Sequence, residues 1–541
     1  MKLAASAVAV TALMVGLAGP AAGGGPRAGA ASNGPRVGAA RPAGARSVRI
    51  SRGPVAAQAG WKAGRAPLPA GAAADALTTL SQVVCPSATR CVAAGSYQDA
   101  AGNFQGMLLM RHRRGWTAIR APLPAGAATQ PASLISGLAC PSVTLCVAAG
   151  SYQDAAGNFQ GMLLMRHRRG WTAIRAPLPA GAATNPETGI TAVACGSATA
   201  CAAIGGYTDS SGSGQLLLLT MRGSSWTAAA APVPPDAAAS GAANLAVLAC
   251  PSASACTAAG TYLDSSDRSR PLVLTMRGSS WTAAGAPLPA DAPADPYIYI
   301  LGLACRSARA CVATGYYGDA SSPAAGNEGL LLTRRGSSWT ATTAPLPGGI
   351  SAAYTSVWAV ACPPGAGCTA VGSYLTPPGT SDSGGLLLTR HRRSWRAVQA
   401  PLPADAASSP VTSIRAVACP TATACTAIGS YSDSAANSQG LLLTRHRNRW
   451  TAATAPLPAG AATNPEVYLT GIACPSATAC AAIGNYTDSA GNVQGLLLTK
   501  GHSHSFQPTA QERARLWPEF EDDVDRGLGD PPEPAEAGVV G

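Results

Sequence analysis

Ile190 to Pro232 reads ITAVACGSATACAAIGGYTDSSGSGQLLLLTMRGSSWTAAAAP, and this stretch decides the fold. It contains four short apolar runs, at residues 190–195, 201–207, 215–220 and 226–231. Alanine and leucine favour helix, but Gly, Ser or Pro interrupts every run before a stable helix could form. Short strands separated by turn residues predict a four-stranded antiparallel meander.

The same pattern occurs eight times along the chain of 541 residues. Each unit carries two cysteines with five residues between them, and the pairs start 55 or 57 residues apart. Residues 92–129 and 147–184 are identical. A fixed period of this length indicates a repeat architecture. Units one to eight are defined by the pairs Cys85/Cys91, Cys140/Cys146, Cys195/Cys201, Cys250/Cys256, Cys305/Cys311, Cys362/Cys368, Cys419/Cys425 and Cys474/Cys480.

The third strand of each unit is predicted to be buried on both faces. Leucines are consecutive at 441–443 and at 496–498, whereas a strand with one wet face would alternate apolar and polar residues. A four-stranded sheet that is covered on both faces needs a neighbour on each side. Radially stacked sheets provide such neighbours.

The two ends of the repeat region are complementary. Residues 61–69 match a fourth strand with no strands before it, and residues 469–499 match the first three strands of a unit with no fourth. We therefore predict that the N-terminal strand completes the last sheet and closes a ring. An open array is the alternative, although such arrays normally end in polar capping repeats.

This organisation resembles the β-propeller superfamily of kelch, WD and sialidase-type repeats. The resemblance covers residues 60–500 and rests on a recurring Ala-Cys-Pro-Ser-Ala-Thr-x-Cys, Gly-x-Tyr-x-Asp, Gln-Gly-Leu-Leu-Leu-Thr, Trp-Thr-Ala and Ala-Pro-Leu-Pro. The Gly-His and Trp-Asp pairs of WD repeats and the kelch double glycine do not recur from unit to unit. The sialidase-type box places Asp and Trp only a few residues apart, whereas Asp99 lies 17 residues before Trp116. The resemblance implies an all-β, eight-bladed propeller of four-stranded blades, but it implies no activity.

Recurrent residues have structural explanations. Each cysteine pair flanks a short turn and is expected to bridge the first two strands, because two thiolates per unit cannot form a four-ligand zinc site. The tryptophan that opens each fourth strand is expected to wedge between neighbouring blades. The aspartate that follows the second strand in every unit except unit six is expected to hydrogen-bond its turn. A rim of Tyr and Asp that binds sugars is the sharper alternative.

The regions outside the repeats indicate secretion. Residues 1–22 read as a signal peptide, with Lys2 followed by an apolar run from Leu3 to Leu17. Residues 23–59 are a Gly/Ala/Pro/Arg linker, and residues 501–541 form an acidic tail. We expect no transmembrane segment in the mature chain, and a monomer. Abundant Ala and the preference for Arg over Lys resemble an actinobacterial composition.

The chain carries a net charge of +12, and residues 60–500 hold 28 basic and 17 acidic groups. The turn before the fourth strand is especially basic in units one, two, six and seven. On a ring these turns would form one crescent that could hold teichoic acid, anionic lipid headgroups or nucleic acid through charge alone. Solvated turn tips are the alternative explanation. The arginines concerned are Arg111, Arg113, Arg114, Arg166, Arg168, Arg169, Arg390, Arg392, Arg393, Arg445 and Arg447.

Aromatic residues break the symmetry in one sector. Trp358 stands where other units carry a small or polar residue such as Ser81, and Tyr297, Tyr299 and Tyr354 lie nearby in the sequence. Added aromatics in a uniform ring suggest a ligand site. Local packing is the alternative.

We find no constellation typical of an enzyme, and we expect no cofactor and no metal. The repeat region has three glutamates, Glu187, Glu328 and Glu466, all expected in loops, and no paired carboxylates stand out. The sequence favours a secreted, non-catalytic binding or scaffolding propeller for cell-wall glycans or anionic polymers, with a protein partner as a further option and no specific nucleic-acid recognition. An extracellular hydrolase or lyase with a central site, and a purely structural repeat protein, are the alternatives. The ligand, cell-surface attachment and the role of the tail are not specified.

Overall fold

The computed structural model describes residues 60–112, 115–167, 170–322, 326–376 and 383–501. The predicted signal peptide, the linker and the tail after Gly501 lie outside these residues. The described part is built from 32 strands and contains no helix, so the predicted all-β class is confirmed. It follows that none of the described residues forms a helix able to cross a membrane.

Unit three shows how one sheet is built. β10 (Gly189–Ser197), β11 (Ala200–Thr208), β12 (Gly214–Arg222) and β13 (Ser225–Ala230) pair in sequence order, and every pairing is antiparallel. This is the meander predicted from the spacing of the turn residues. Most of the predicted strands are extended by one or two residues at an end, because pairing continues into the polar turns.

The other units repeat this order. Their strands are β1 (Trp61–Arg65); β2 (Thr78–Ser87), β3 (Arg90–Gln98), β4 (Phe104–His112), β5 (Gly115–Arg120); β6 (Leu134–Ala139), β7 (Cys146–Gln153), β8 (Phe159–His167), β9 (Gly170–Arg175); β14 (Ala243–Ser252), β15 (Ala255–Leu263), β16 (Ser269–Arg277), β17 (Ser280–Gly285); β18 (Pro296–Ser307), β19 (Ala310–Asp319), β20 (Asn327–Arg335), β21 (Ser338–Thr343); β22 (Tyr354–Ala361), β23 (Thr369–Leu375), β24 (Ser383–His391), β25 (Ser394–Gln399); β26 (Thr412–Ala418), β27 (Ala424–Ser432), β28 (Ser438–His446), β29 (Arg449–Thr454); and β30 (Tyr468–Ser476), β31 (Ala479–Thr487), β32 (Val493–Lys500).

Units five and six differ from the prediction of separate sheets. Their strands form one sheet of eight, joined by a single parallel bridge between Asn327 in β20 and Tyr354 in β22. The Asn327 side chain also donates to the Thr355 carbonyl oxygen at 2.8 Å. The remaining strands form six four-stranded sheets. One local bridge therefore merges two units that otherwise keep the repeat.

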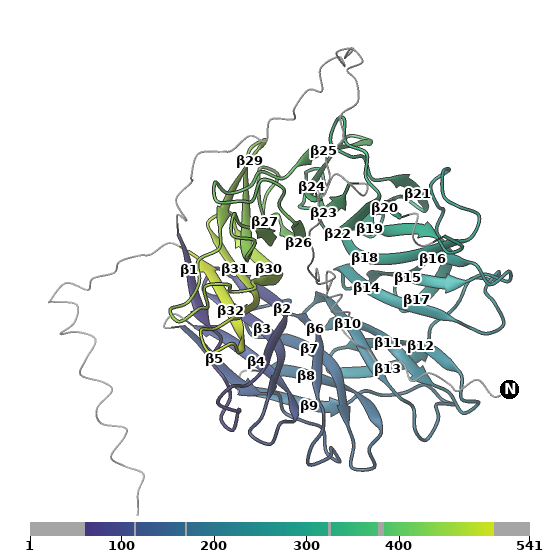
Figure 1. Cartoon of the computed structure of the whole chain (residues 1–541). Helices are drawn as coiled ribbons and strands as arrows, with labels where there is room; N and C mark the ends of the chain where they lie inside the picture. Colours follow the sequence, from purple (N-terminus) through teal and green to yellow (C-terminus); the bar gives the residue numbers. More distant parts are fainter. Residues whose placement is uncertain (1–59, 113–114, 168–169, 323–325, 377–382, 502–541) are drawn as a thin grey trace, which may run out of the picture. The chain divides into compact units, whose positions relative to one another are not determined.

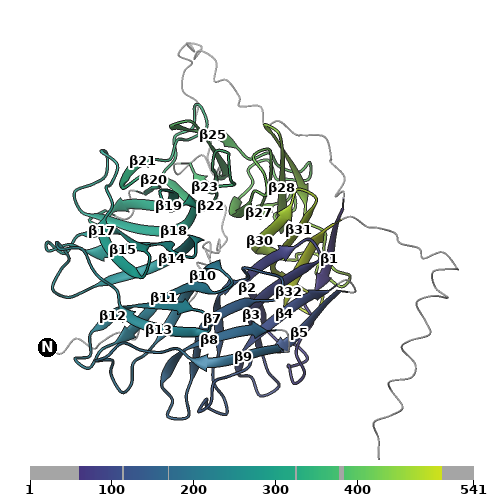
Figure 2. The same ribbon diagram turned by 180° about the vertical axis from the view of Figure 1, so that it is seen from behind.

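The sheets are arranged radially, with the first strand of each unit innermost (Figures 1 and 2). Each first strand contacts the first strand of the next unit, from β2 through β6, β10, β14, β18, β22 and β26 to β30. β30 in turn contacts β2. Antiparallel meanders placed side by side around an axis are the architecture of a β-propeller.

The N-terminal strand pairs with the last strand of the chain. β1 lies antiparallel to β32, with Trp61 opposite Lys500, and completes the sheet β1-β32-β31-β30. Across this sheet Cys480, Lys500 and Trp61 are in register, as Cys201, Met221 and Trp226 are in unit three. Trp61 is therefore the eighth member of the recurrent tryptophan series.

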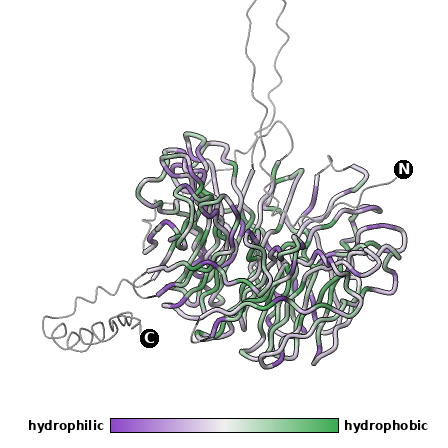
Figure 3. Tube along the Cα trace, turned by 90° about the horizontal axis from the view of Figure 1, so that it is seen from below, coloured by the Kyte–Doolittle hydropathy of each residue, from purple (hydrophilic) through white to green (hydrophobic). Residues whose placement is uncertain are grey.

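The core lies between neighbouring sheets. The third-strand leucines are buried on both faces, as predicted; Leu441 to Leu443 are at most 2% exposed. Figure 3 shows hydrophobic stretches along the strands and many hydrophilic residues in the turns. Between the last and first units, Ile483 and Leu497 pack with Leu80 and Met107, as other neighbours do. Such interfaces bury the apolar faces of the sheets.

All eight cysteine pairs form disulfides within their own unit, which confirms the predicted pairing. In unit three, Cys195 in β10 lies opposite Cys201 in β11. The bridge therefore holds the two innermost strands together at one end of the sheet.

The two cysteines of a pair differ in burial. The first is half-buried in every unit, whereas the second is at most 3% exposed. In three units the second sulfur reaches a threonine of the preceding unit; Cys311 Sγ, for example, lies 3.7 Å from Thr257 Oγ1. The sulfur of the second cysteine is thus packed between units, so the pair contributes to the fold. The buried members are Cys91, Cys146, Cys201, Cys256, Cys311, Cys368, Cys425 and Cys480.

Removing one bridge should lower stability modestly. We expect the free energy of unfolding of the Cys195→Ala/Cys201→Ala double variant to be about 2 kcal/mol lower than that of the unmodified protein. The reason is that the bridge no longer restricts the unfolded chain by closing a small loop. Chemical denaturation of the secreted protein, with and without the substitutions, measures this difference. A midpoint equal to that of the unmodified protein would show that the bridge contributes nothing.

Candidate functional site

Each sheet has two chemically different edges. In unit three, Ala200, Arg222 and Ser225 are in register, so the turn from β10 to β11 and the turn from β12 to β13 lie at the same edge. We call this the cysteine-turn edge. The opposite edge carries the turn from β11 to β12, which begins at Asp209, and the connections between units. We call it the aspartate-turn edge.

The cysteine-turn edges of neighbouring units lie next to each other. The Arg222 guanidinium of unit three donates to the Ala253 carbonyl oxygen of unit four at 2.6 Å. In the same way, Arg335 of unit five donates to the Arg392 carbonyl oxygen of unit six at 2.9 Å. These contacts join turn to turn at the same edge. The edges therefore form one face of the ring.

Basic residues gather at this face in every unit. They come from the cysteine turns, from the ends of the third strands and from the turns that follow. The described ones are Arg90, Arg111, Arg166, Arg222, Arg277, Arg306, Arg309, Arg334, Arg335, Arg390, Arg392, Arg393, Arg445, Arg447, Arg449 and Lys500.

Acidic residues gather at the other face. Every Asp and Glu in the described part of the chain lies at an aspartate-turn edge or in the adjoining connection: Asp75, Asp99, Asp154, Glu187, Asp209, Asp236, Asp264, Asp267, Asp291, Asp295, Asp319, Glu328, Asp405, Asp433, Glu466 and Asp488. The single ion pair among the described residues, Arg270 with Asp264 at 2.7 Å, belongs to this face. The charge of the cysteine-turn face is therefore not neutralised by carboxylates of the described chain.

The predicted arginine crescent is only partly available to a ligand. Arg392, Arg393 and Arg447 are exposed. Arg445 is 6% exposed and donates to Thr369 Oγ1 at 2.9 Å and to the Ala422 carbonyl oxygen at 2.8 Å, and burial lowers its pKa. The contact of Arg445 with Thr369 joins units six and seven, so this arginine acts as a packing residue.

The corresponding arginines Arg111, Arg166 and Arg390 are half-buried, and burial lowers their pKa values as well. They occupy the register position of Met221 in unit three, beside the cysteine and the tryptophan. Of the other predicted members, Arg113, Arg114, Arg168 and Arg169 lie outside the described residues.

The sequence prediction missed exposed arginines of this face, among them Arg449 and three that belong to the cysteine turns. Arg90, Arg306 and Arg309 lie in or beside the cysteine turns, which appear far from the basic turns in the sequence. The sequence contained this signal, because the turn after the first strand and the turn after the third strand of an antiparallel meander must lie at the same edge of the sheet.

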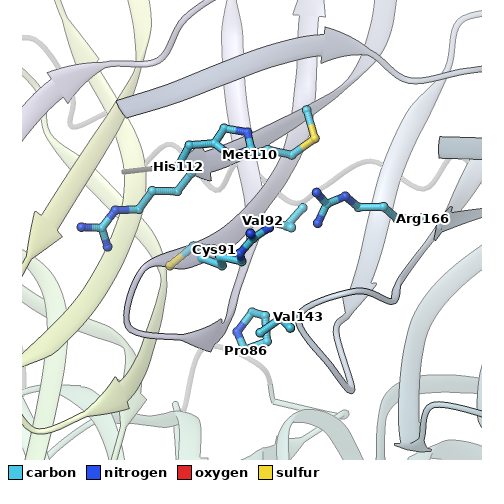
Figure 4. Close-up of a pocket in the computed structure, with 9 residues that line it drawn as sticks. Pro86, Cys91, Val92, Met110, His112, Val143 and Arg166 are labelled. Carbon is cyan, nitrogen blue, oxygen red and sulfur yellow. The ribbon is translucent and has the colours of Figure 1, made fainter. Parts of the chain in front are cut away.

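A small recess forms where the cysteine-turn edges of units one and two meet, lined by Pro86, Cys91, Val92, Val143 and Arg166, among others (Figure 4).

The recurrent aspartates hold their turns, as predicted. Asp209 Oδ1 accepts hydrogen bonds from the backbone N–H groups of Ser211 and Ser213 at 2.9 and 3.0 Å. Its Oδ2 accepts from Gln215 Nε2 at 2.8 Å. The side-chain hydrogen bond from Ser211 and the bond from the Ser213 backbone lower the pKa of Asp209 to about 2. Turn formation therefore occupies both oxygens of this carboxylate.

The predicted aromatic sector divides into two groups. In unit five, Tyr299 stacks on Tyr316 with ring centroids 5.0 Å apart, and Tyr297 meets Tyr316 edge to face at 6.4 Å. Tyr299 is 51% exposed, and Tyr354 at the start of β22 is 37% exposed. Tyr316 was not predicted; it stands where unit one has Ser96.

Trp358 belongs to the second group. Its indole donates to Ser373 Oγ at 3.2 Å within unit six. The Arg415 guanidinium of unit seven lies 4.0 Å from the centre of the Trp358 ring and 5.2 Å from that of Tyr468 in unit eight. Neither Arg415 nor Tyr468 was predicted, although the alignment that singled out Trp358 also places Arg415 at the same position.

One glutamate is not where the sequence predicted it. Glu328 lies in β20 rather than in a loop. Its Oε2 accepts a hydrogen bond from the Tyr317 hydroxyl at 2.7 Å, and Asp291 Oδ1 lies 3.2 Å from the same hydroxyl. Burial is the largest cause of the raised pKa of Tyr317. Two carboxylates thus share one tyrosine at the aspartate-turn edge.

A scan against models of protein families finds no match, and a search of the curated proteins finds none. Among solved structures, the WD40 domain of SCAP from fission yeast is 8% identical, with 81% of this chain and 98% of that chain covered and a TM-score of 0.39. A triple arginine mutant of AofleA from Arthrobotrys oligospora is 12% identical, with 64% and 91% covered and a TM-score of 0.29.

Trypanosoma rangeli sialidase in complex with sialic acid is 7% identical, with 78% of this chain covered and a TM-score of 0.33. The chain spans 54% of the length of that sialidase. The assignment of a β-propeller rests on the sheet topology and not on these matches.

Acid should weaken the aspartate turns. A carboxyl whose folded pKa is depressed contributes stability above its unfolded pKa of about 4, and that contribution is lost as the pH falls toward the folded value. For Asp209 this window runs from about pH 4 down to about pH 2. We expect the midpoint temperature of thermal unfolding to fall less across this window in the Asp209→Asn variant than in the unmodified protein. Identical pH profiles would contradict the assignment.

Proposed function

We propose that this chain is a secreted, non-catalytic binding module, a closed eight-bladed propeller that holds an extracellular anionic polymer across its cysteine-turn face. The pairing of β1 with β32 and the contact of β30 with β2 support closure. The eight disulfides support an oxidising compartment, where such bonds persist.

The observation that carries the proposal is the sorting of charge. Basic residues from all eight units share one face, and the described carboxylates lie at the other. Arg222 and Arg335 each reach a turn of the next unit, so basic residues of neighbouring units lie side by side on this face. Guanidinium groups also match the geometry of phosphate and carboxylate oxygens. A flexible chain of phosphates or carboxylates could therefore contact several units at once.

Backbone conformation gives independent support. In units three, four and five the turn before the fourth strand places a glycine at positive φ, for example 63° at Gly223. Units six and seven place arginine at the same position, with φ of 52° at Arg392 and 55° at Arg447. Left-handed backbone costs a non-glycine residue about 1 kcal/mol or more. Units six and seven therefore retain a charged side chain at a position where glycine would cost less.

The repeat itself supplies the test. The variant Arg392→Gly/Arg393→Ser/Arg447→Gly/Arg449→Ser gives units six and seven the uncharged turn residues of unit three. We expect it to be at least as stable as the unmodified protein and to bind purified wall teichoic acid at least ~4-fold more weakly at low salt, since four exposed charges contribute about 0.2–1 kcal/mol each.

The matched control removes the same charge from the other face, by changing Arg65, Arg120, Arg175 and Arg268 to serine. Its affinity for teichoic acid should stay within about twofold. Equal losses in both variants would mean that net charge alone drives binding, and undiminished binding by the first variant would exclude the cysteine-turn face. Neutral dextran should bind none of the three proteins.

A further inference from the structure

Arg415 occupies a position that has a defined role elsewhere in the ring. It lies at the irregularity in β26, between Ile414 and Ala416, where the register with β27 shifts. At the same place in units one, three and eight, Ser81, Thr191 and Thr470 donate to a carbonyl oxygen of the next unit's first strand. Thr470, for example, donates to the Leu80 carbonyl oxygen at 2.9 Å. This position therefore faces the neighbouring inner strand.

Units four to seven replace the hydroxyl with Ala246, Leu301, Trp358 and Arg415. Units four to seven therefore lack the side-chain hydroxyl that bonds to the next unit elsewhere. Two of the replacements, Trp358 and Arg415, contact each other across the interface between units six and seven. They form a group with Tyr468, which we call the channel cluster.

The Arg415 guanidinium is held by aromatic faces rather than by a carboxylate. It lies 4.0 Å from the Trp358 ring centre and 5.2 Å from the Tyr468 ring centre. Its Nε is buried and has no hydrogen-bond partner, and no carboxylate of the described chain forms an ion pair with it. Cation–π contacts compensate only part of the cost of taking a cation out of water.

The geometry leaves one kind of interaction open. Arg415 is only half-buried and its Nε is enclosed, so its two terminal NH2 groups are the ones that remain for an acceptor. A carboxylate is the acceptor that matches these groups with two parallel hydrogen bonds. Tyr468 is 41% exposed and presents an apolar ring beside the cation. A carboxylate on a ring with an apolar face would use both features.

The surroundings limit the charge of the ligand. Tyr468 begins β30 at the aspartate-turn edge, and Glu466 lies exposed two residues before it. The carboxylates at this edge would repel a polyanion. They would repel a molecule with a single carboxylate much less. The channel cluster and the cysteine-turn face therefore differ in the ligand that each can accept.

We propose that Trp358, Arg415 and Tyr468 form a binding site for a single carboxylated sugar residue of the uronic acid type, separate from the polymer-binding face. Arg415 binds the carboxylate through its terminal NH2 groups. Tyr468 contacts the apolar face of the sugar ring, and Trp358 holds the guanidinium in place from the other side.

The test compares galacturonate with galactose, which has the same ring but lacks the carboxylate. Ligand-detected NMR on the full-length secreted protein should give an affinity for galacturonate at least ~10-fold higher than for galactose, the effect of a hydrogen-bonded charge pair. The variant Arg415→Thr restores the residue that units three and eight carry and should fold normally. We expect it to lose this preference.

The quadruple variant of the cysteine-turn face serves as the control and should bind galacturonate as the unmodified protein does. Loss of the preference in Arg415→Thr with retention in the quadruple variant would support the site, even if the protein bound no teichoic acid. Equal binding of galacturonate and galactose, no binding of either, or galacturonate binding that survives in Arg415→Thr would overturn the proposal.

Discussion

The antiparallel pairing of β1 with β32 is the interaction on which the proposed closure of the propeller depends. It brings together strands that lie more than 400 residues apart and supplies the last unit with its fourth strand. It also places Trp61 in register with Lys500 and Cys480, so that the interface between the last and first units has the same layer of side chains as the others. Without it, the third strand of the last sheet would expose an unpaired edge. The faces that we describe exist only because every sheet keeps its neighbours.

The meander converts a short repeat into two opposed surfaces. Because successive turns alternate between edges, a residue type that recurs in one turn of each unit accumulates on one face of the ring. Cysteine turns and basic turns thus share a face, while aspartate turns and inter-unit connections share the other. Most of this charge lies in turns, where it is compatible with the fold, so charge can vary with little effect on the core. Arg445 shows the boundary, since it lies two residues before the turn and is already buried between units.

Much of the fold could be predicted from the sequence, because its signals are local and are repeated eight times. The four runs in residues 190–231, the cysteine pairing and the match between the Trp61 segment and the last unit all follow from spacing. The bridge between Asn327 and Tyr354 could not be predicted, since it depends on where two irregular loops meet. The site was predicted less well. Arg415 and Tyr468 become neighbours of Trp358 only when inner strands of three units are placed side by side, and reading one unit at a time does not reveal this.

Hydrogen exchange of the β32 amides tests the closure of the ring most directly. Gly64→Pro removes the backbone donor that faces Leu497 of β32, because Ala66, two residues further on, donates to the Gly495 carbonyl oxygen and bonded pairs alternate along the ladder; it should disrupt the pairing of β1 with β32. Ala70→Pro places the same residue in the exposed turn after β1, where Ala72 N–H bonds to the Pro69 carbonyl oxygen and proline is tolerated. We expect the amides of Leu497 and Thr499, which face β1, to exchange at least ~10-fold faster in the first variant and at an unchanged rate in the second. Equal protection of these amides in both variants would contradict a ring closed by the N-terminal strand.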